Sequence, residues 1–295
     1  MKRREFLKDL TVGSLMLRIS PHLLAQASNY PDLAVIEGES PSLITKEAVK
    51  YLGGMQRFIA KGDKVLVKPN IGWDRKPEQA ACTNPDVIKT LVELCLEAGA
   101  KEVKVMDNPC NPARRTYVRS GIQKAAKKAG AKVPLPNKHK LKKLAIHGDS
   151  IKDWEVYTDF VEADKIINAP IAKTHSLSRV TLGMKNWLGA IGGNRNQLHQ
   201  NLDLAVIDLA AFFKPVLTVL DAYRMLIRNG PQGGRISDTK LQKTVIAGID
   251  YVAVDAMGAT LFGINPKELR FLPLAQQKGH GEFDLEKLKI EKRTI

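Results

Sequence analysis

The chain has 295 residues, 44% of them hydrophobic, so it is long enough to bury a full core, which argues against intrinsic disorder. It carries 46 lysines and arginines against 31 acids, and a formal charge of +15. Aromatic residues make up only 6% and no helix-turn-helix or RNP-like motif occurs, so nucleic acid is not the expected partner, although polyanion binding stays open as a third reading.

The first residues carry a twin arginine, Arg3 and Arg4, followed by a moderately apolar stretch over 10–24 and a small-x-small site ending at Ala27. This pattern resembles a twin-arginine export signal cleaved after Ala27. Its apolar part is too short and too interrupted to predict a transmembrane helix, so no membrane span is expected in the mature chain. Residues 1–27 therefore predict export to the periplasm by the twin-arginine translocase, a route that carries folded and often cofactor-loaded proteins.

Strands and helices alternate along the rest of the chain, residues 28–295. Apolar runs and helical periodicity predict strands over 33–36, 64–70, 101–106, 164–169, 215–220 and 243–247, and helices over 44–60, 84–98, 114–129, 202–213, 251–262 and 265–277. The alternation predicts an α/β fold with a mainly parallel sheet and crossover helices on both faces. Residues 134–153 show no sustained period, so we expect one large domain with a small insertion over about 133–160.

Polar residues follow several of the predicted strands. Lys68 and Asn70 come at the end of the strand over 64–70, Asp107 follows the strand over 101–106, and Asp221 follows the strand over 215–220. Because ligands of open α/β sheets collect at the carboxyl ends of the strands, these four residues are predicted to bind a ligand or cofactor. Asp255, inside a predicted helix, is a candidate ligand or holds a neighbouring backbone.

The densest group of candidates lies in residues 164–193. Asn168, a further predicted cofactor contact, falls in a strand that Pro170 ends, and if 171–175 stays extended, Lys173 and His175 share one face. Lys173 is predicted to act in catalysis or hold an anion, and His175 to transfer protons or to ligate a metal. A solvated lysine and a hydrogen-bonded structural histidine are the alternatives.

The same stretch continues with Lys185 and Asn186 among glycines, where backbone can approach a ligand closely. Lys185 is a predicted catalytic residue, and Asn186, Gly192 and Gly193 are predicted to contact a cofactor. Gly230, in a second glycine-rich loop over 229–235, is predicted to help cradle an anion with backbone amides, although a wide turn is the preferred explanation of that loop.

The three cysteines, Cys82, Cys95 and Cys110, contain no Cys-x-x-Cys pair. The chain therefore lacks an iron-sulfur cluster motif. Cys95 lies in an apolar helical run and is expected to be buried, whereas a disulfide between Cys82 and Cys110 stays open.

An ordered series of short motifs resembles the DUF362 family, a domain of unknown function, over about residues 62–283. The series consists of Val67-Lys68-Pro69-Asn70, Thr83-Asn84-Pro85, Ile167-Asn168-Ala169-Pro170 with Lys173-Thr174-His175, Thr181-Leu182-Gly183-Met184-Lys185-Asn186, Asp221-Ala222 with Asn229-Gly230-Pro231 and Gly233, and Asp250 with Ala253-Val254-Asp255-Ala256. The family's biochemistry is unsettled, and some members carry an additional iron-sulfur domain that this chain lacks. A more distant analogy, to lactate racemases with a nickel nucleotide on a lysine, makes Lys185 a candidate and implies nothing further.

The leading hypothesis is an exported protein that binds an anionic ligand or cofactor in a crevice lined by lysines and His175, with redox or isomerisation chemistry. The cofactor is unidentified, with a metal or a nucleotide-like group as the candidates. The alternative, from a different class, is a non-catalytic periplasmic binding or accessory protein that uses the same basic pocket.

Overall fold

The computed structural model describes residues 29–295, so the predicted signal over 1–27 lies outside the described part of the chain. Within that part, nine strands form one mixed sheet and two form a separate antiparallel pair, β4 (Leu141–Ala145) and β5 (Asp153–Tyr157). Across the main sheet the order is β11 (Ile290–Thr294), β1 (Leu33–Glu37), β10 (Thr239–Gly248), β9 (Leu217–Leu226), β6 (Lys165–Ala169), β2 (Lys64–Pro69) and β3 (Glu102–Val105), and β7 (Ile171–His175) pairs with β9 and with β8 (Arg179–Thr181).

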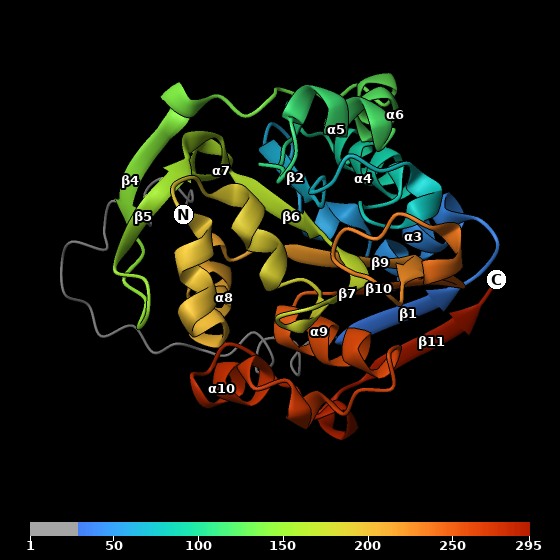
Figure 1. The fold of residues 1–295 in the computed structure, drawn as a ribbon. Coiled ribbons are helices and arrows are strands. Elements are labelled where there is room, and N and C mark those ends of the chain that lie inside the picture. Colours follow the sequence, from blue (N-terminus) through green and yellow to red (C-terminus); the bar gives the residue numbers. More distant parts are fainter. Residues whose placement is uncertain (1–28) are drawn as a thin grey trace.

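Five of the eight strand pairs in the main sheet are parallel. One face packs against α3 (Pro41–Tyr51), α4 (Pro85–Glu97), α5 (Ala113–Arg119) and α6 (Ile122–Lys128). The other face packs against α7 (Thr158–Glu162), α8 (Leu202–Phe213), α9 (Tyr251–Thr260) and α10 (Phe271–Gln277). Figure 1 shows α4, α5 and α6 on one side of the sheet and α8, α9 and α10 on the other. The predicted α/β class, a mainly parallel sheet covered on both faces, is confirmed.

The burial of β2 shows how strand geometry divides the core. Val65 and Val67 belong to the apolar cluster with α3 to α6, whereas Leu66 between them belongs to the cluster on the opposite face. Successive side chains of a strand point to opposite faces, so a continuous apolar run is buried on both sides. This is the pattern of a central strand in a two-sided sheet.

Short 3-10 turns complete the fold. They are η1 (Met55–Arg57), η2 (Pro77–Gln79), η3 (Lys138–Lys140), η4 (Lys185–Ala190), η5 (Arg195–Asn201), η6 (Ile236–Asp238), η7 (Pro266–Glu268) and η8 (Leu285–Lys287). The turn η4 follows β8 after three residues and brings Asn186 to the end of β2.

Several predicted boundaries are wrong. The helix expected over 44–60 begins at Pro41 and ends at Tyr51, before Gly53 and Gly54 at φ +100° and +78°. The helix expected over 114–129 is two helices, because Gly121 between them has φ +74°. The helix expected from 265 starts as the turn η7, and only α10 is α-helical.

The strand expected to end before Asp221 continues to Leu226, so Asp221 lies inside β9 and not at its end. Antiparallel pairing with the ten-residue strand β10 carries β9 past the acid. The prediction that Asp221 ends a strand is therefore wrong.

Candidate functional site

The sheet forks at Pro170. Before it, β6 pairs with β9 at Leu217 and Thr218 and with β2 on its other side; after it, β7 pairs with β9 and turns to pair with β8 instead of β2. The carboxyl ends of β2 and β3 lie beside this fork, as expected for a ligand site in an open α/β sheet. The predicted lysines and asparagines meet here.

Lys68 lies deepest in this cluster. Its Nζ atom forms an ion pair with Asp107 Oδ1 at 2.7 Å, and it also donates to Pro69 O at 2.8 Å and to Asn186 Oδ1 at 3.0 Å. Burial lowers the pKa of Lys68, and the charge of Asp107 opposes that shift. The three partners match the three protons of the ammonium group, so Lys68 is held in place and is not available to a ligand.

Asp107 is held just as firmly. Its Oδ2 atom accepts from the backbone N–H of Ile71 at 2.5 Å, and its own backbone carbonyl accepts from the Tyr117 hydroxyl at 2.6 Å. A side chain at Gly189 would place a Cβ atom only 1.8 Å from Asp107 Oδ1. The ion pair therefore needs glycine at position 189 as well as its hydrogen bonds.

Three asparagines join the strand ends to η4. The Oδ1 atom of Asn186 accepts from Asn70 Nδ2 at 3.0 Å and from Lys68, and its Nδ2 atom donates to Asn168 Oδ1 at 2.9 Å. Asn168 in turn donates to the carbonyl of Gly183 at 2.9 Å. Because each amide is bonded to its neighbour, the network fixes where η4 and its Lys185 lie.

Lys173, on β7, is less committed. It is 1% exposed, and its Nζ atom donates to Ala81 O at 2.6 Å and to Asn70 Oδ1 at 3.0 Å. Burial is the main cause that lowers the pKa of Lys173 to about 8. Two bonds leave one of its three protons without a partner among the described residues.

Lys185 is the least committed of the three lysines. It is 8% exposed, and among the described residues its Nζ atom makes a single hydrogen bond, with Ser178 Oγ at 2.7 Å. Burial, and after it the charge of Lys173, lowers the pKa of Lys185 to about 7. At neutral pH this amine is therefore about half deprotonated, as a proton-transferring lysine needs to be.

His175 stays neutral beside it. Burial, and then the charges of Lys185 and Lys173, lowers the pKa of His175 to about 3. Its Nδ1 atom accepts from the backbone N–H of Leu177 at 3.1 Å, so the proton lies on Nε2. A metal-bound histidine usually donates its other N–H to an acceptor, which is the reverse of this arrangement. His175 therefore fits a hydrogen-bond donor better than a metal ligand.

The predicted residues outside the lysine cluster have other neighbours. Asp221 is buried and accepts from the backbone N–H groups of Asn84 and Tyr223 at 2.7 and 3.0 Å, and burial raises its pKa to about 6. It thereby anchors the start of α4. Asp255 accepts from the backbone N–H groups of Gly183 and Met184, which agrees with the prediction that it holds a neighbouring backbone.

The predicted glycines divide between two places. Gly230 packs onto β7, where a Cβ atom would lie 1.9 Å from Thr174 O, next to Lys173. Gly192 instead contacts the β4–β5 sheet: it donates to Glu155 O at 2.8 Å and its carbonyl accepts from Trp154 Nε1 at 3.0 Å. Gly193 lies against Trp154 and Glu155 of β5, and Gly192 also lies against Leu141 of β4, so both glycines face the β4–β5 sheet and not the lysines.

Sequence reasoning missed three groups at the site. Ser178 holds Lys185, the carbonyl of Ala81 holds Lys173, and the ring of His199 stacks 6.4 Å from that of His175. A backbone carbonyl leaves no signal in a sequence. Ser178 and His199 became meaningful only when the fold brought them beside Lys185 and His175.

Metal-ligating side chains do not gather anywhere in the described residues. Within 29–295 no three histidine, cysteine or acidic side chains are placed to hold a metal ion. Cys82, Cys95 and Cys110 are all free, with Cys95 buried as expected. No helix in this range is long and apolar enough to cross a membrane.

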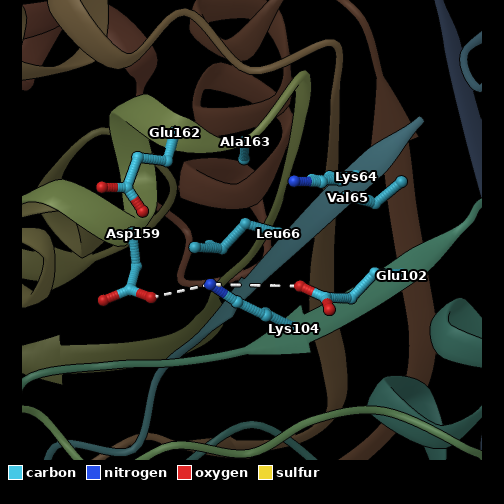
Figure 2. A pocket seen from close by; sticks show the side chains of 8 residues that line it. All are labelled: Lys64, Val65, Leu66, Glu102, Lys104, Asp159, Glu162 and Ala163. Carbon is cyan, nitrogen blue, oxygen red and sulfur yellow. Dashed lines mark hydrogen bonds and ion pairs between the residues drawn. The ribbon is translucent and has the colours of Figure 1, made fainter.

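Figure 2 shows a hollow at the other end of β2, lined by Lys64, Val65, Leu66, Glu102, Lys104, Asp159, Glu162 and Ala163. Lys104 lies between Asp159 Oδ1 at 2.9 Å and Glu102 Oε1 at 4.0 Å. Lys104 is compensated by these carboxylates, and Lys64, the other lysine of the hollow, lies at the exposed start of β2, so the hollow lacks the buried amines of the lysine cluster.

Three comparisons relate the chain to known proteins. The family model described as "Domain of unknown function (DUF362)" matches residues 65–260. The chain is 25% identical over 251 residues to "Thylakoid-associated protein sll1697" of Synechocystis sp., covering 82% of this chain and 76% of that protein. It also superposes on the lactate racemase apoprotein from Thermoanaerobacterium thermosaccharolyticum with a TM-score of 0.48 and 11% identity, covering 77% of this chain and only 56% of that one.

Proposed function

Since the chain belongs to the DUF362 family, whose function is not described, we propose from its own side chains that it binds a small anion at the forked edge of the sheet. One observation supports this most strongly: Lys185 is buried, has a single hydrogen bond within the described part of the chain, and has a pKa lowered to about 7. A buried amine in that state gains most from an anionic partner, which restores its charged form.

The charges of the cluster also favour an anion. Lys68, Lys173 and Lys185 contribute three amines, and the acid that pairs directly with them, Asp107, is taken by Lys68. A carboxylate or a phosphate ester would accept from Lys173 and Lys185 and from Nε2–H of His175. Such a ligand would supply the missing negative charge.

The chemistry we propose at this site is proton transfer, as in an isomerisation or a proton-coupled redox step. A half-deprotonated lysine can remove a proton from a bound substrate and return it. Proton transfer of this kind is most efficient when the pKa of the lysine lies near the working pH. His175, which stays neutral, would orient the substrate and not exchange protons. An unidentified cofactor would bind through Lys173 and Lys185, the two lysines that the network leaves with protons to donate.

The second candidate is a non-catalytic binding or accessory protein. It is favoured by the hydrogen-bond network that joins Lys68 and the three asparagines, which builds a rigid binding wall. Export by the twin-arginine route and a periplasmic location belong to both proposals. The relative's name associates that protein with thylakoids, and an envelope location is proposed here from residues 1–27 alone.

Native mass spectrometry with a metal scan tests the proposal, on full-length protein purified from the cytoplasm and from the periplasm. An anionic small molecule should co-purify, and Lys185→Met and His175→Ala should lose it. Lys46→Met, at an exposed lysine outside the lysine cluster, is the matched control and should retain the anionic molecule. If nothing co-purifies and both site variants leave the cellular phenotype intact, the enzymatic proposal fails.

Export is tested separately. Replacing Arg3 and Arg4 together by lysine should leave the protein in the cytoplasm, measured by cell fractionation. Unchanged delivery to the periplasm would overturn the proposed route without touching the anion site.

A further inference from the structure

A long stretch of the chain carries only positive charge. Residues 108–148 hold eleven lysines and arginines and no aspartate or glutamate, with Asp107 and Asp149 as the flanking acids. At the frequency of 31 acids in 295 residues, about four would be expected in these 41 positions. We call this stretch the basic segment.

The fold places the basic segment along one edge of the molecule. It comprises α5, α6, the connection to β4 and β4 itself, and Figure 1 shows these elements following one another along the upper edge, in green. Five of its cations form ion pairs with Asp74, Glu102, Asp153 or Asp159. Six others have no ion pair among the described residues: Arg114, Lys124, Lys127, Lys128, Lys138 and Lys142.

We propose that the basic segment docks the protein onto an anionic lipid surface. Charge complementarity carries the inference, because six uncompensated cations on one edge create the positive potential that negatively charged headgroups attract. The lysine cluster at the fork is buried and takes no part in it, so this proposal stands independently of the proposed function.

The composition of the segment favours a lipid surface over a nucleic acid. Eight of its eleven cations are lysines, which act as point charges, whereas arginine is the residue suited to bidentate phosphate recognition. Its one aromatic residue of the Phe, Tyr or Trp type, Tyr117, is fully buried and cannot stack on a base.

An exposed apolar side chain adds to the argument. Val118 is 65% exposed and lies between Arg115 and Arg119 on the outer side of α5. An apolar side chain among arginines suits the boundary between headgroups and acyl chains, since arginine stems can cover apolar surface while their charged heads stay in water. The same helix carries Tyr117, which bonds Asp107, so docking would hold the lysine cluster near the headgroups.

Vesicle co-sedimentation of the full chain tests this inference. The wild type should bind vesicles containing phosphatidylglycerol, should ignore pure phosphatidylcholine vesicles, and should lose binding as salt rises. Each cation near an anionic surface is worth about a fivefold change in partitioning. Replacing Arg114, Lys124, Lys127 and Lys128 together by glutamine should therefore weaken binding at least tenfold.

The matched control removes the same charge elsewhere. Glutamine at Lys46, Lys61, Lys240 and Lys267, all exposed and outside the basic segment, should leave binding within about twofold of the wild type. Equal losses in both variants would mean that net charge alone attracts the vesicles, and the segment would have no special role. Failure of the wild type to bind, or displacement of bound vesicles by competing RNA or DNA, would overturn the lipid proposal.

Discussion

Replacing Lys185 by methionine should change how the stability of the protein depends on pH. Burial lowers the pKa of Lys185 from 10.5 to about 7. Between these two values the unfolded chain binds a proton that the folded chain does not, so wild-type stability rises as the pH rises. Below pH 7 both states are protonated and the folded protein carries the full cost of the buried charge, about 5 kcal/mol.

The size of the effect follows from the same two pKa values. Between pH 6 and pH 9 the lysine should add about 2.5 kcal/mol to the free energy of unfolding of the wild type, at about 1.4 kcal/mol per pH unit in the steep part. Methionine has nearly the same length and no charge, so the variant should lack this rise. The variant should therefore gain stability relative to the wild type at pH 6 and lose about half of that advantage by pH 9.

Guanidinium unfolding at pH 6, 7.5 and 9 measures the difference directly. Lys46→Met, at an exposed position, is the control and should give a curve parallel to that of the wild type. If the Lys185→Met curve is parallel to the wild type as well, Lys185 has an ordinary pKa in the folded protein. The reasoning that makes it a proton-transferring group would then be refuted.

Three further predictions concern the groups around Lys185, each measured by chemical denaturation. Asp107→Asn should destabilise the protein by about 3–5 kcal/mol, because it leaves the buried charge of Lys68 without its partner; a loss under about 1 kcal/mol would mean that the pair is not formed. Gly189→Ala should cost more than about 2 kcal/mol, because its Cβ atom would lie 1.8 Å from Asp107 Oδ1, whereas Gly279→Ala, in open space at φ +74°, should cost only about 1 kcal/mol. Burial raises the pKa of Asp255 from 3.8 to about 7, so between these values the folded state keeps a proton that the unfolded state has lost, and the stability of the wild type should fall by up to about 4 kcal/mol as the pH rises from 4 to 7. Asp255→Asn should not show this fall. A fall that persists in the variant would point to another group.

Local signals in the sequence were enough for much of the fold. Asn84 caps α4 by accepting from the backbone N–H of Asp86, and Pro85 occupies the first helical position, as predicted. The sequence also contains signals for the helix ends that the predictions did not use. These are Gly53, Gly54 and Gly121, which all have a positive φ that glycine adopts most easily. Helical periodicity continues across these glycines, so the sequence predicted helices over 44–60 and 114–129 that are too long.

Asp221 shows what local patterns cannot supply. An acid after an apolar run is a reasonable strand end, yet here its carboxyl group accepts from the N–H of Asn84, 137 residues earlier in the chain. That partner makes the acid acceptable inside a buried strand. Only the folded arrangement of β9 beside the start of α4 could reveal it.

The site was predictable as a set of residues but not as a set of roles. The rule that ligands collect at strand ends selected Lys68, and the crowded stretch selected Lys173 and Lys185. Which amine is free depends on partners contributed from elsewhere: Lys68 meets Asn186, 118 residues away, and Lys173 meets the carbonyl of Ala81. The sequence gives the three lysines the same predicted role, whereas the structure distinguishes them by how many ammonium protons already have a partner.

That ranking connects stability with binding. The fold neutralises Lys68 with Asp107, but no carboxylate within residues 29–295 forms an ion pair with Lys185, so an amine that costs stability when charged is kept half-deprotonated beside a neutral histidine. An anion entering there would favour the protonated lysine, and the free energy recovered from the strained charge would appear as affinity for the ligand. Proton uptake and anion binding are then two sides of one equilibrium, because the same missing negative charge sets both the pKa of Lys185 and the preference of the site.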